Sequence, residues 1–443
     1  MKNTSNTISQ DASGAGLSPT AGSRDALSRR SFLGKSTAAG GAATFTIVKA
    51  QQVRSTGKAL LKAGLVGVGG RGRQAVVDLL TGTENIEVVA MADVFEDHLE
   101  KNLAWLRNEP RHQAIQSRIK VDPDRRFVGF ESYKKLIASD VDIVMLCTPP
   151  GWRPIHFEAA IEANKHVFCE KPFGTDPVGV QRFMRAAKKS EERKLTVVSG
   201  AQRRANREYV ETVEKIKEGR IGEIVAAYAY WIGTPVIKQR ARDPKLGDME
   251  WQHRNWYSYV WLCGDQVVEQ HLHNIDVINW VVGMHPASVV AHGGCAWRPK
   301  DEIHGNIYDH ISADFVYPNG IRMSSYCRQY PGNLYRNVSE LVVGAKGRSN
   351  CHDMGTPGPR DYVHEHTKMA ASIRGDGPYL NEAMVVAEST MACVMARESA
   401  YSGQEITWDM AMNSKLDLMP GTFGYDAKFD LTPLPVPGVY KFI

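Results

Sequence analysis

The chain has 443 residues, of which 43% are hydrophobic and 23% are charged, a composition typical of a globular protein with roughly two to three domains. Its formal net charge is +5, with basic and acidic residues interspersed along the sequence, so we expect no nucleic-acid partner. The seven cysteines include no C-x-x-C pair, which argues against a disulfide framework and against a zinc knuckle.

The N-terminal segment has the pattern of a twin-arginine export signal. Arg29 and Arg30 lie in Ser-Arg-Arg-Ser-Phe-Leu-Gly-Lys, and a weakly apolar, Ala/Gly-rich stretch runs from there to Ala50. The sequence therefore predicts a signal peptide over 1–50 and a periplasmic or otherwise extracytoplasmic protein; a disordered basic tail is the alternative. This stretch is too short to span a bilayer, and no other segment approaches about 18 uninterrupted apolar residues, so no membrane-spanning helix is expected.

The first half of the mature chain alternates apolar runs with helical patterns, which predicts an α/β fold with a doubly wound, mostly parallel Rossmann sheet. The apolar runs are 63–68, 86–92, 141–147, 166–169 and 195–199, and the helical patterns are 74–80, 96–107, 155–163 and 177–189. The charged stretch 121–126 is typical of a loop. We place this domain at residues 60–202.

The second half changes character at about residue 203. Helical patterns cover 208–218, 265–282 and 380–401, while strand patterns cover 223–231, 287–293, 311–317, 321–328 and 338–343. Runs of strands with few crossovers predict an α+β domain over 203–443, with an open, mostly antiparallel sheet and helices on one of its faces.

A G-x-G-x-x-G turn directly follows the first apolar run. Gly67 permits the tight strand-to-helix turn, Gly69 lets the backbone approach a pyrophosphate, and Gly72 lets the helix pack closely on the strand. Asp93 ends the next apolar run, 21 residues after Gly72, where a carboxylate accepts the ribose hydroxyls and repels a 2′-phosphate. The pattern predicts NAD as the cofactor, although nearby arginines such as Arg71 leave NADP possible.

A Glu170-Lys171-Pro172 sequence closes the fourth apolar run. Ligands of doubly wound sheets bind beyond the carboxyl ends of the strands, so Lys171 should point into the crevice that holds the nicotinamide. Pro172 favours an extended backbone at Lys171, which aims the amine outward and not into a helix.

Thr148 and Pro149 end the third apolar run at the same edge of the sheet, and His156 follows them. Together with the glycine turn and the Glu-Lys-Pro sequence, these residues resemble the glucose–fructose oxidoreductase / inositol dehydrogenase (Gfo/Idh/MocA) family over about residues 60–403. The resemblance implies a nucleotide-binding domain followed by a domain that binds the substrate and mediates oligomerisation. A homo-oligomer, either a dimer or a tetramer, is therefore expected.

In the family's dehydrogenases, the lysine works with an aspartate and with a histidine four residues later. Glu269 stands here at the aspartate position and His273 at the histidine position, while His271 replaces the usual glycine. Positions i and i+4 share one face of a helix, so a continuous helix over 265–282 would point Glu269 and His273 together and His271 elsewhere. A hydrogen-bonded histidine that only supports the domain junction is the alternative interpretation of His273.

The predicted site residues form two groups. The catalytic residues are Lys171, Glu269 and His273, and the cofactor-binding residues are Gly67, Gly69, Gly70, Arg71, Gly72, Asp93, Thr148, Pro149, His156, Glu170 and Lys171. No metal site is expected, because histidines two positions apart, as in His271-x-His273, diverge on a helix. The aromatic residues Trp251, Trp256, Tyr257, Tyr259 and Trp261 form either a sugar-stacking wall or part of the core.

These residues predict an NAD(P)-dependent oxidoreductase that oxidises a hydroxyl of a sugar, polyol or glycoside. His273 would remove the hydroxyl proton, with Glu269 orienting its ring, and Lys171 would stabilise the negative charge on the oxygen. Twin-arginine substrates are exported folded, so such an enzyme should hold its cofactor tightly. Two alternatives stay open: redox-neutral, NAD-dependent glycoside cleavage through oxidation, elimination, hydration and reduction, and a non-catalytic module that binds a dinucleotide or a sugar.

Overall fold

The computed structural model describes residues 59–236 and 239–443. The predicted twin-arginine signal over 1–50 lies outside these residues and stays a prediction, as does the export that it implies. Over the described ranges, no helix is both long enough and apolar enough to cross a bilayer.

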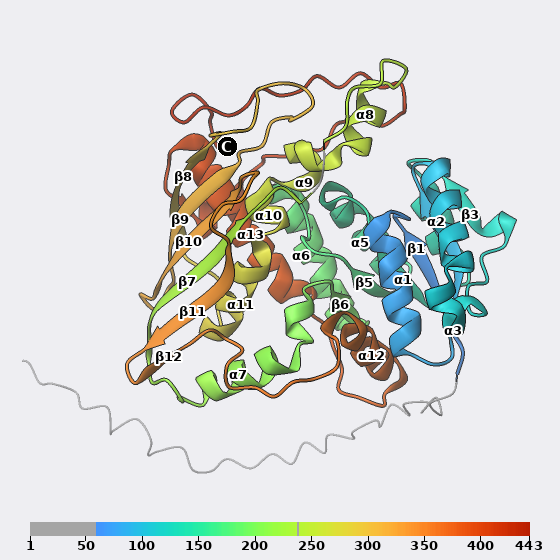
Figure 1. Cartoon of the computed structure of the whole chain (residues 1–443), viewed down its shortest axis with the longest axis horizontal. Coiled ribbons are helices and arrows are strands. Elements are labelled where there is room, and N and C mark those ends of the chain that lie inside the picture. The colour runs from blue at the N-terminus through green and yellow to red at the C-terminus, as the bar shows by residue number, and fades with distance from the viewer. Residues whose placement is uncertain (1–58, 237–238) are drawn as a thin grey trace, which may run out of the picture. The chain divides into compact units, whose positions relative to one another are not determined.

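A six-stranded, wholly parallel sheet in the order β3-β2-β1-β4-β5-β6 forms the first domain (Figure 1). Its strands are β1 (Leu61–Val66), β2 (Ile86–Asp93), β3 (Arg126–Val128), β4 (Ile143–Leu146), β5 (His166–Cys169) and β6 (Val197–Ser199). Its helices are α1 (Gly70–Gly82), α2 (Glu96–Asn108), α3 (Gln113–Gln116), α4 (Ser132–Ala138), α5 (Arg153–Glu162) and α6 (Pro177–Glu192). This strand order is that of a doubly wound dinucleotide-binding fold, which confirms the predicted Rossmann sheet.

Three short elements of this domain, α3, β3 and α4, were not predicted. β3 has three residues, too few to show an alternating pattern, and it includes Arg126 of the stretch that we expected to be a loop. α4 has seven residues, of which Tyr133 and Leu136 are buried in the core against β2. Elements of this length carry almost no periodic signal, so only their packing reveals them.

The second domain contains a seven-stranded sheet in the order β12-β11-β7-β10-β9-β8-β13 (Figure 1). Its strands are β7 (Ile224–Gly233), β8 (Ser288–Gly294), β9 (His310–Val316), β10 (Arg322–Gln329), β11 (Asn337–Gly344), β12 (Gly347–Ser349) and β13 (Ile406–Thr407). The helices are α7 (Arg207–Lys217), α8 (Asp248–Arg254), α9 (Val260–Cys263), α10 (Gln266–Glu269), α11 (Leu272–Val282), α12 (Asp361–Arg374), α13 (Ala383–Ser402) and α14 (Trp408–Asn413). Neighbouring strands are antiparallel except β7 and β10, so the predicted mostly antiparallel sheet is confirmed.

One face of the second sheet packs against α10, α11 and α13. In β10, Met323 and Cys327 are buried on this side, whereas Arg322 and Tyr326 on the opposite side are exposed. Such alternation is expected of a sheet with one covered face, because successive side chains point to opposite sides. The expected oligomeric state stays a prediction.

Helix α12 packs against α1 of the first domain, although it lies far along the chain (Figure 1). Met369 and Ala370 of α12 are buried in the same hydrophobic core as α1. Just after α12, Asn381 forms a parallel bridge with Val197 at the edge of the first sheet. No helix or strand was predicted at 361–374.

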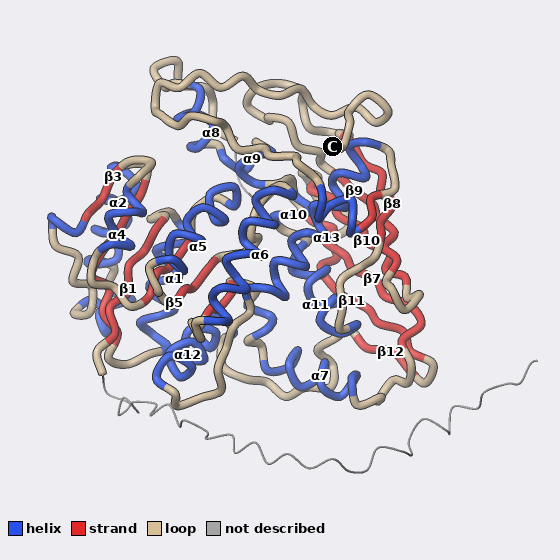
Figure 2. Tube along the Cα trace, turned by 180° about the vertical axis from the view of Figure 1, so that it is seen from behind, coloured by secondary structure: helices blue, strands red, loops and turns tan. Residues whose placement is uncertain are grey.

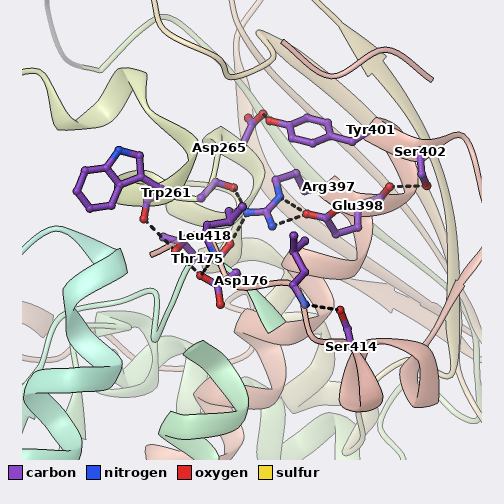
Figure 3. Close-up of polar contacts among 12 residues, drawn as sticks. Thr175, Asp176, Trp261, Asp265, Arg397, Glu398, Tyr401, Ser402, Ser414 and Leu418 are labelled. Carbon is purple, nitrogen blue, oxygen red and sulfur yellow. Dashed lines mark hydrogen bonds and ion pairs between the residues drawn. The ribbon is translucent and has the colours of Figure 1, made fainter. Parts of the chain in front are cut away.

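A buried arginine joins the two domains (Figure 3). Arg397 of α13 forms an ion pair with Glu398 at 2.5 Å. Its guanidinium also donates to the carbonyl of Thr175, just before α6, and at 3.1 Å to the carbonyl of Gly264, just after α9. Thr175 belongs to the first domain and Gly264 to the second, so one guanidinium bridges the two domains. Burying a charge costs free energy, and this cost is offset only while all of its hydrogen-bond and ion-pair partners are present.

Candidate active site

A cavity of about 780 Å³ is lined by both domains, at the carboxyl ends of the strands of the first sheet. Lys171, Glu269 and His273 all line it. So do most of the predicted cofactor-binding residues, namely Gly67, Gly69, Gly70, Arg71, Asp93, Thr148, Pro149, His156 and Glu170. The structure therefore brings together, in one cavity, residues that the sequence places far apart.

The glycine turn is closed on its protein side and open on its cavity side. Gly67 has a φ of +92°, and a Cβ there would lie 2.7 Å from the backbone of Cys147; a Cβ at Gly72 would lie 2.0 Å from the Gly67 carbonyl oxygen. A Cβ at Gly69 or Gly70 would instead meet no heavy atom within 4 Å. The free space lies at the N-terminus of α1, so these residues fit the pyrophosphate of a dinucleotide.

Asp93 is the last residue of β2 and is 9% exposed. Its Oδ2 accepts a hydrogen bond from the Val68 N–H at 2.6 Å, and its Oδ1 accepts one from the Phe95 N–H at 2.8 Å. Burial raises the pKa of Asp93 above 3.8, whereas these two hydrogen bonds lower it. The side chain is thus held at the edge of the cavity where a Rossmann domain binds the adenosine ribose.

Arg71 lines the cavity, but carboxylates engage its guanidinium. It lies 2.5 Å from Glu170, 3.2 Å from Asp78 and 3.6 Å from Glu365 of α12. Burial, followed by the nearby charge of Glu170, raises the pKa of Glu365 well above 4.5. Arg71 is therefore placed to hold Glu170 beside Lys171, and it does not offer a free cation to a 2′-phosphate.

The segment after β4 forms one wall of the cavity. Thr148 Oγ1 and His156 Nδ1 share a hydrogen bond of 3.3 Å. Burial, together with the charge of Arg153 and a second arginine, lowers the pKa of His156 to about 3, so its ring is neutral. Trp152 stacks on His156 with ring centres 5.6 Å apart, and its indole N–H donates to His253 Nε2 at 2.9 Å.

Lys171 reaches from the first domain to the end of α10 in the second. Its Nζ donates to Glu269 Oε1 at 3.0 Å and to the Glu269 carbonyl oxygen at 2.5 Å. The adjacent Glu170 stays ionised, because the charges of Arg71 and Arg153 outweigh the opposing effect of burial and lower its pKa below 4.5. The positive charge of Lys171 is therefore paired with Glu269, and these two hydrogen bonds fix the direction of its amine across the cavity.

The predicted continuous helix over 265–282 is interrupted. Between α10 and α11, the N–H of His271 bonds the carbonyl of Gln266, five residues back, at 3.2 Å. His271 is buried, and its Nε2 lies 2.7 Å from Ser325 Oγ of β10. An imidazole buried without a partner is unfavourable, so this hydrogen bond to the sheet favours the interruption.

Glu269 and His273 consequently do not share a helical face, although both line the cavity. Over the part of the chain that the structure describes, no hydrogen bond joins Glu269 to His273, so the predicted orientation of the imidazole by Glu269 is not found. Trp231 of β7 stacks on the imidazole instead, with ring centres 5.9 Å apart and the planes inclined by 24°. His273 Nδ1 is buried without a partner, which leaves Nε2 as the nitrogen available to a bound molecule.

The imidazole of His273 is neutral at neutral pH. Burial is the main cause that lowers its pKa well below 6.5, and the positive charges of Lys171, Arg203 and Arg71 act in the same direction. A neutral imidazole is the form that can accept a proton as a general base. Lys171 and His273 therefore present a donor and an acceptor to the same cavity.

The predicted aromatic group divides between the cavity and the core. Trp256 and Tyr257 line the cavity, whereas Trp251, Tyr259 and Trp261 lie in a buried hydrophobic cluster.

Arg254 of α8 and Tyr362 of α12 are among the lining residues that were not predicted. Neither stands in a recognisable local pattern, because each reaches the cavity only through the packing of a distant helix.

Comparisons with known proteins agree with this architecture. Residues 61–198 match the model of the "Oxidoreductase family, NAD-binding Rossmann fold", and residues 209–349 match the "GFO/IDH/MocA C-terminal domain". Together these matches cover more than half of the chain.

Among curated proteins, the chain is similar to inositol 2-dehydrogenase from Salmonella typhimurium (strain LT2), with 25% identity over 223 residues, which is 50% of this chain and 54% of that protein. It is also similar to myo-inositol 2-dehydrogenase from Thermotoga maritima, with 24% identity over 234 residues, which is 52% of this chain and 58% of that protein. The chain thus spans about half the length of the curated relatives that it matches.

Solved structures share the fold. Scyllo-inositol dehydrogenase from Lactobacillus casei, solved with NAD(H) and scyllo-inositol, superposes with a TM-score of 0.60 at 18% identity, covering 79% of this chain and 99% of that one. The WlbA dehydrogenase from Bordetella pertussis, solved with NADH and UDP-GlcNAcA, gives a TM-score of 0.60 at 20% identity, covering 79% and 98%. With an NAD-binding Rossmann domain followed by the matching C-terminal domain, the chain belongs to the Gfo/Idh/MocA family of oxidoreductases.

Proposed function

We propose that this protein is an NAD-dependent oxidoreductase that oxidises a hydroxyl group of a sugar, polyol or glycoside. The observation that carries the proposal is the convergence of Lys171 and His273, from two domains, on the cavity that the glycine turn also lines. The names of its relatives, which are inositol dehydrogenases, support a polyhydroxylated substrate.

The residues at this site divide the chemistry between them. The glycine turn and Asp93 would hold NAD⁺, which would supply the acceptor for a hydride from the carbon that bears the hydroxyl. His273 takes the hydroxyl proton at Nε2, and Lys171 donates a hydrogen bond to the same oxygen while negative charge develops on it. The carbon loses two electrons with the hydride, so the hydroxyl becomes a carbonyl. Glu269 holds the amine in position through the ion pair of 3.0 Å.

The residues around the glycine turn favour NAD over NADP. Gly69 and Gly70 leave space for the pyrophosphate, and Asp93 is held where the adenosine ribose binds. Arg71, the arginine nearest to this site in sequence, donates hydrogen bonds to the carboxylates of Glu170 and Asp78. A 2′-phosphate would therefore meet the Asp93 carboxylate, which repels it.

Replacement of Lys171 tests the proposal. We expect Lys171→Ala to lower the rate of hydroxyl oxidation about 10²–10⁴-fold, because the charge on the oxygen loses its donor, while the nucleotide stays bound. The measurement is the formation of reduced nicotinamide with a panel of inositols and aldoses, alongside the mass of the nucleotide released by denaturation. Lys188→Ala, at an exposed position of α6, is the matched control. Near-native rates in Lys171→Ala would contradict the proposed mechanism.

Redox-neutral glycoside cleavage is the second candidate, and the predicted export signal over 1–50 favours it. An exported protein has little free cofactor to exchange, so oxidation and reduction would have to alternate on one bound nucleotide. Purified protein is incubated with a chromogenic glycoside and no added cofactor. Release of the aglycone without net reduced nicotinamide supports cleavage; up to one equivalent of reduced nicotinamide without aglycone supports plain oxidation; neither product, with the nucleotide bound, supports a binding module.

A further inference from the structure

The cavity extends past Asp93 toward the residues that follow β2 and β3. The side chains and backbone of Val94, Phe95, His98, Gly129 and Phe130 line this part. In a Rossmann domain the acidic residue at the end of β2 binds the adenosine ribose. These residues therefore mark the adenosine end of the cavity.

Arg254, the last residue of α8, reaches this end from the second domain. Its guanidinium lies 3.9 Å over the centre of the Phe95 ring and donates to both carboxylate oxygens of Asp97, at 3.0 and 3.2 Å. Glu250, one helical turn earlier, accepts a further hydrogen bond at 3.0 Å. An aromatic face and two carboxylates thus fix the planar guanidinium at the rim of the cavity.

The C-terminal tail reaches the same place as a long loop that runs beside α8; it is dark red in Figure 1 and one of the tan loops near α8 in Figure 2. The hydroxyl of Tyr425 donates to the carbonyl of Val94, the residue directly after Asp93. The ring of Tyr425 lies 5.2 Å from that of Phe130, and the ring of Phe423 stacks on Phe130 at 6.3 Å. The tail therefore touches the lining of the adenosine end directly.

The tail and α8 pack as one unit. A Cβ at Gly247, just before α8, would lie 2.1 Å from the carbonyl oxygen of Tyr425, so only a glycine allows this approach. The N–H of Met249 donates to the Ala427 carbonyl at 3.4 Å, and the Gln252 side-chain amide donates to the carbonyl of Phe429 at 3.1 Å.

The tail is anchored on either side of its contact with the cavity. Before Tyr425, the N–H of Leu418 donates to Asp176, the N-cap of α6, at 3.3 Å (Figure 3). After Tyr425, the Asn306 side-chain amide donates to Thr432 Oγ1 at 2.6 Å. Movement of the tail away from the cavity must break contacts with both domains.

We propose that α8 and the tail segment 418–432, together called the strap, hold the adenosine half of the dinucleotide in its site, so that the cofactor stays bound from one turnover to the next. The inference rests on the proposed dinucleotide-dependent function and extends it, because it assigns retention to residues outside both the glycine turn and the catalytic cluster. Hydride transfer takes place at the other end of the ligand. Different residues therefore set the rate of chemistry and the rate of cofactor release.

The test measures release of the cofactor without any substrate. The full-length protein is loaded with isotopically labelled NAD, freed of excess by gel filtration and chased with unlabelled NAD, and the label that remains bound is followed with time. We expect Arg254→Ala to release the label at least about tenfold faster than the wild type, because the cation over Phe95 and the pair with Asp97 are both lost. Tyr425→Phe, which removes only the hydrogen bond to Val94, should give a smaller acceleration.

Arg207→Ala is the matched control, since Arg207 pairs with Glu211 on the exposed surface of α7, does not line the cavity, and should leave release unchanged. Circular dichroism and thermal unfolding confirm that each variant is folded. If Arg254→Ala, Tyr425→Phe and the double variant all release NAD at the wild-type rate, the proposed role of the strap is wrong, even if the wild type oxidises a polyol. Failure of the wild type to bind any nicotinamide dinucleotide would overturn both the strap and the proposed function.

Discussion

The two ends of the cavity are closed by contacts of different physical kinds. At the catalytic end, Lys171 and Glu269 form an ion pair whose side chains are 9% and 8% exposed. At the adenosine end, Arg254 pairs with Asp97, whose side chain is 65% exposed. Removing one partner from a buried ion pair leaves an uncompensated charge in the protein interior, which is strongly destabilising. An exposed ion pair typically contributes at most about 1 kcal/mol to stability. The catalytic end is therefore held by a buried pair of charges, whereas the adenosine end is held by several individually weaker contacts that act together.

This difference suits the two tasks that the proposal assigns to the cavity. Proton transfer needs Lys171 and His273 in a single geometry, and buried, partnered side chains provide it. Retention of a ligand needs many contacts that close over it and can still separate to admit it. The strap supplies such contacts through aromatic rings, backbone hydrogen bonds and one partly exposed ion pair.

The largest effect on cofactor affinity should come from Gly72→Ala, because the glycine turn that it distorts lies between the two ends of the cavity. Its Cβ would lie 2.0 Å from the Gly67 carbonyl oxygen, so the turn must shift and both halves of the dinucleotide lose their register. We expect NAD affinity to fall at least about a hundredfold, as measured by isothermal titration. Gly347→Ala, where a Cβ makes only ordinary contacts, is the control. Unchanged affinity in Gly72→Ala would show that the turn does not hold the pyrophosphate.

Arg397→Met tests whether the buried junction keeps the two domains in register. It leaves Glu398 and the carbonyls of Thr175 and Gly264 without their cation, so we expect the free energy of unfolding to fall by about 3–5 kcal/mol. Urea denaturation followed by tryptophan fluorescence provides the measurement. Arg207→Met, which removes an exposed pair, should change the midpoint little. Equal midpoints for the two variants would mean that Arg397 contributes no more to the free energy of unfolding than an exposed ion pair does.

The smallest effect concerns protonation at the catalytic end. The pKa of His273 is lower in the folded protein than its ordinary 6.5, because the native site favours the neutral ring. Protonation of His273 therefore destabilises the folded protein, and the free energy of unfolding decreases as the pH falls below 6.5. We expect the acid limb of the pH–rate profile to lie below pH 6.5. Lys171→Gln removes one positive charge and should raise the pKa of His273, as followed by NMR titration of the ring and assigned with His273→Asn. An unchanged pKa would show that the two side chains are not electrostatically coupled.

The parts of the site that follow a strand could be predicted from sequence. A strand is an apolar run and a tight turn needs glycine, so the positions of Gly67, Gly72 and Asp93 are visible in a few neighbouring residues. Lys171 lines the cavity, and its position at the carboxyl end of a strand is likewise a local feature of the sequence. The continuous helix over 265–282 was wrong, because the hydrogen bond between His271 and Ser325 of β10 depends on a strand far along the chain.

The sequence by itself determined the Rossmann sheet, the glycine turn and the acidic residue that follows it, because each rests on periodicity or on short spacing. Glu269 and His273 were instead predicted from the resemblance to the family. Only the tertiary structure decided that Glu269 bonds Lys171 instead of His273, that α12 brings Glu365 to Arg71, and that α8 and the tail meet over the adenosine end. These contacts join residues far apart in the chain, and no local pattern encodes them, since each depends on how whole helices and strands pack.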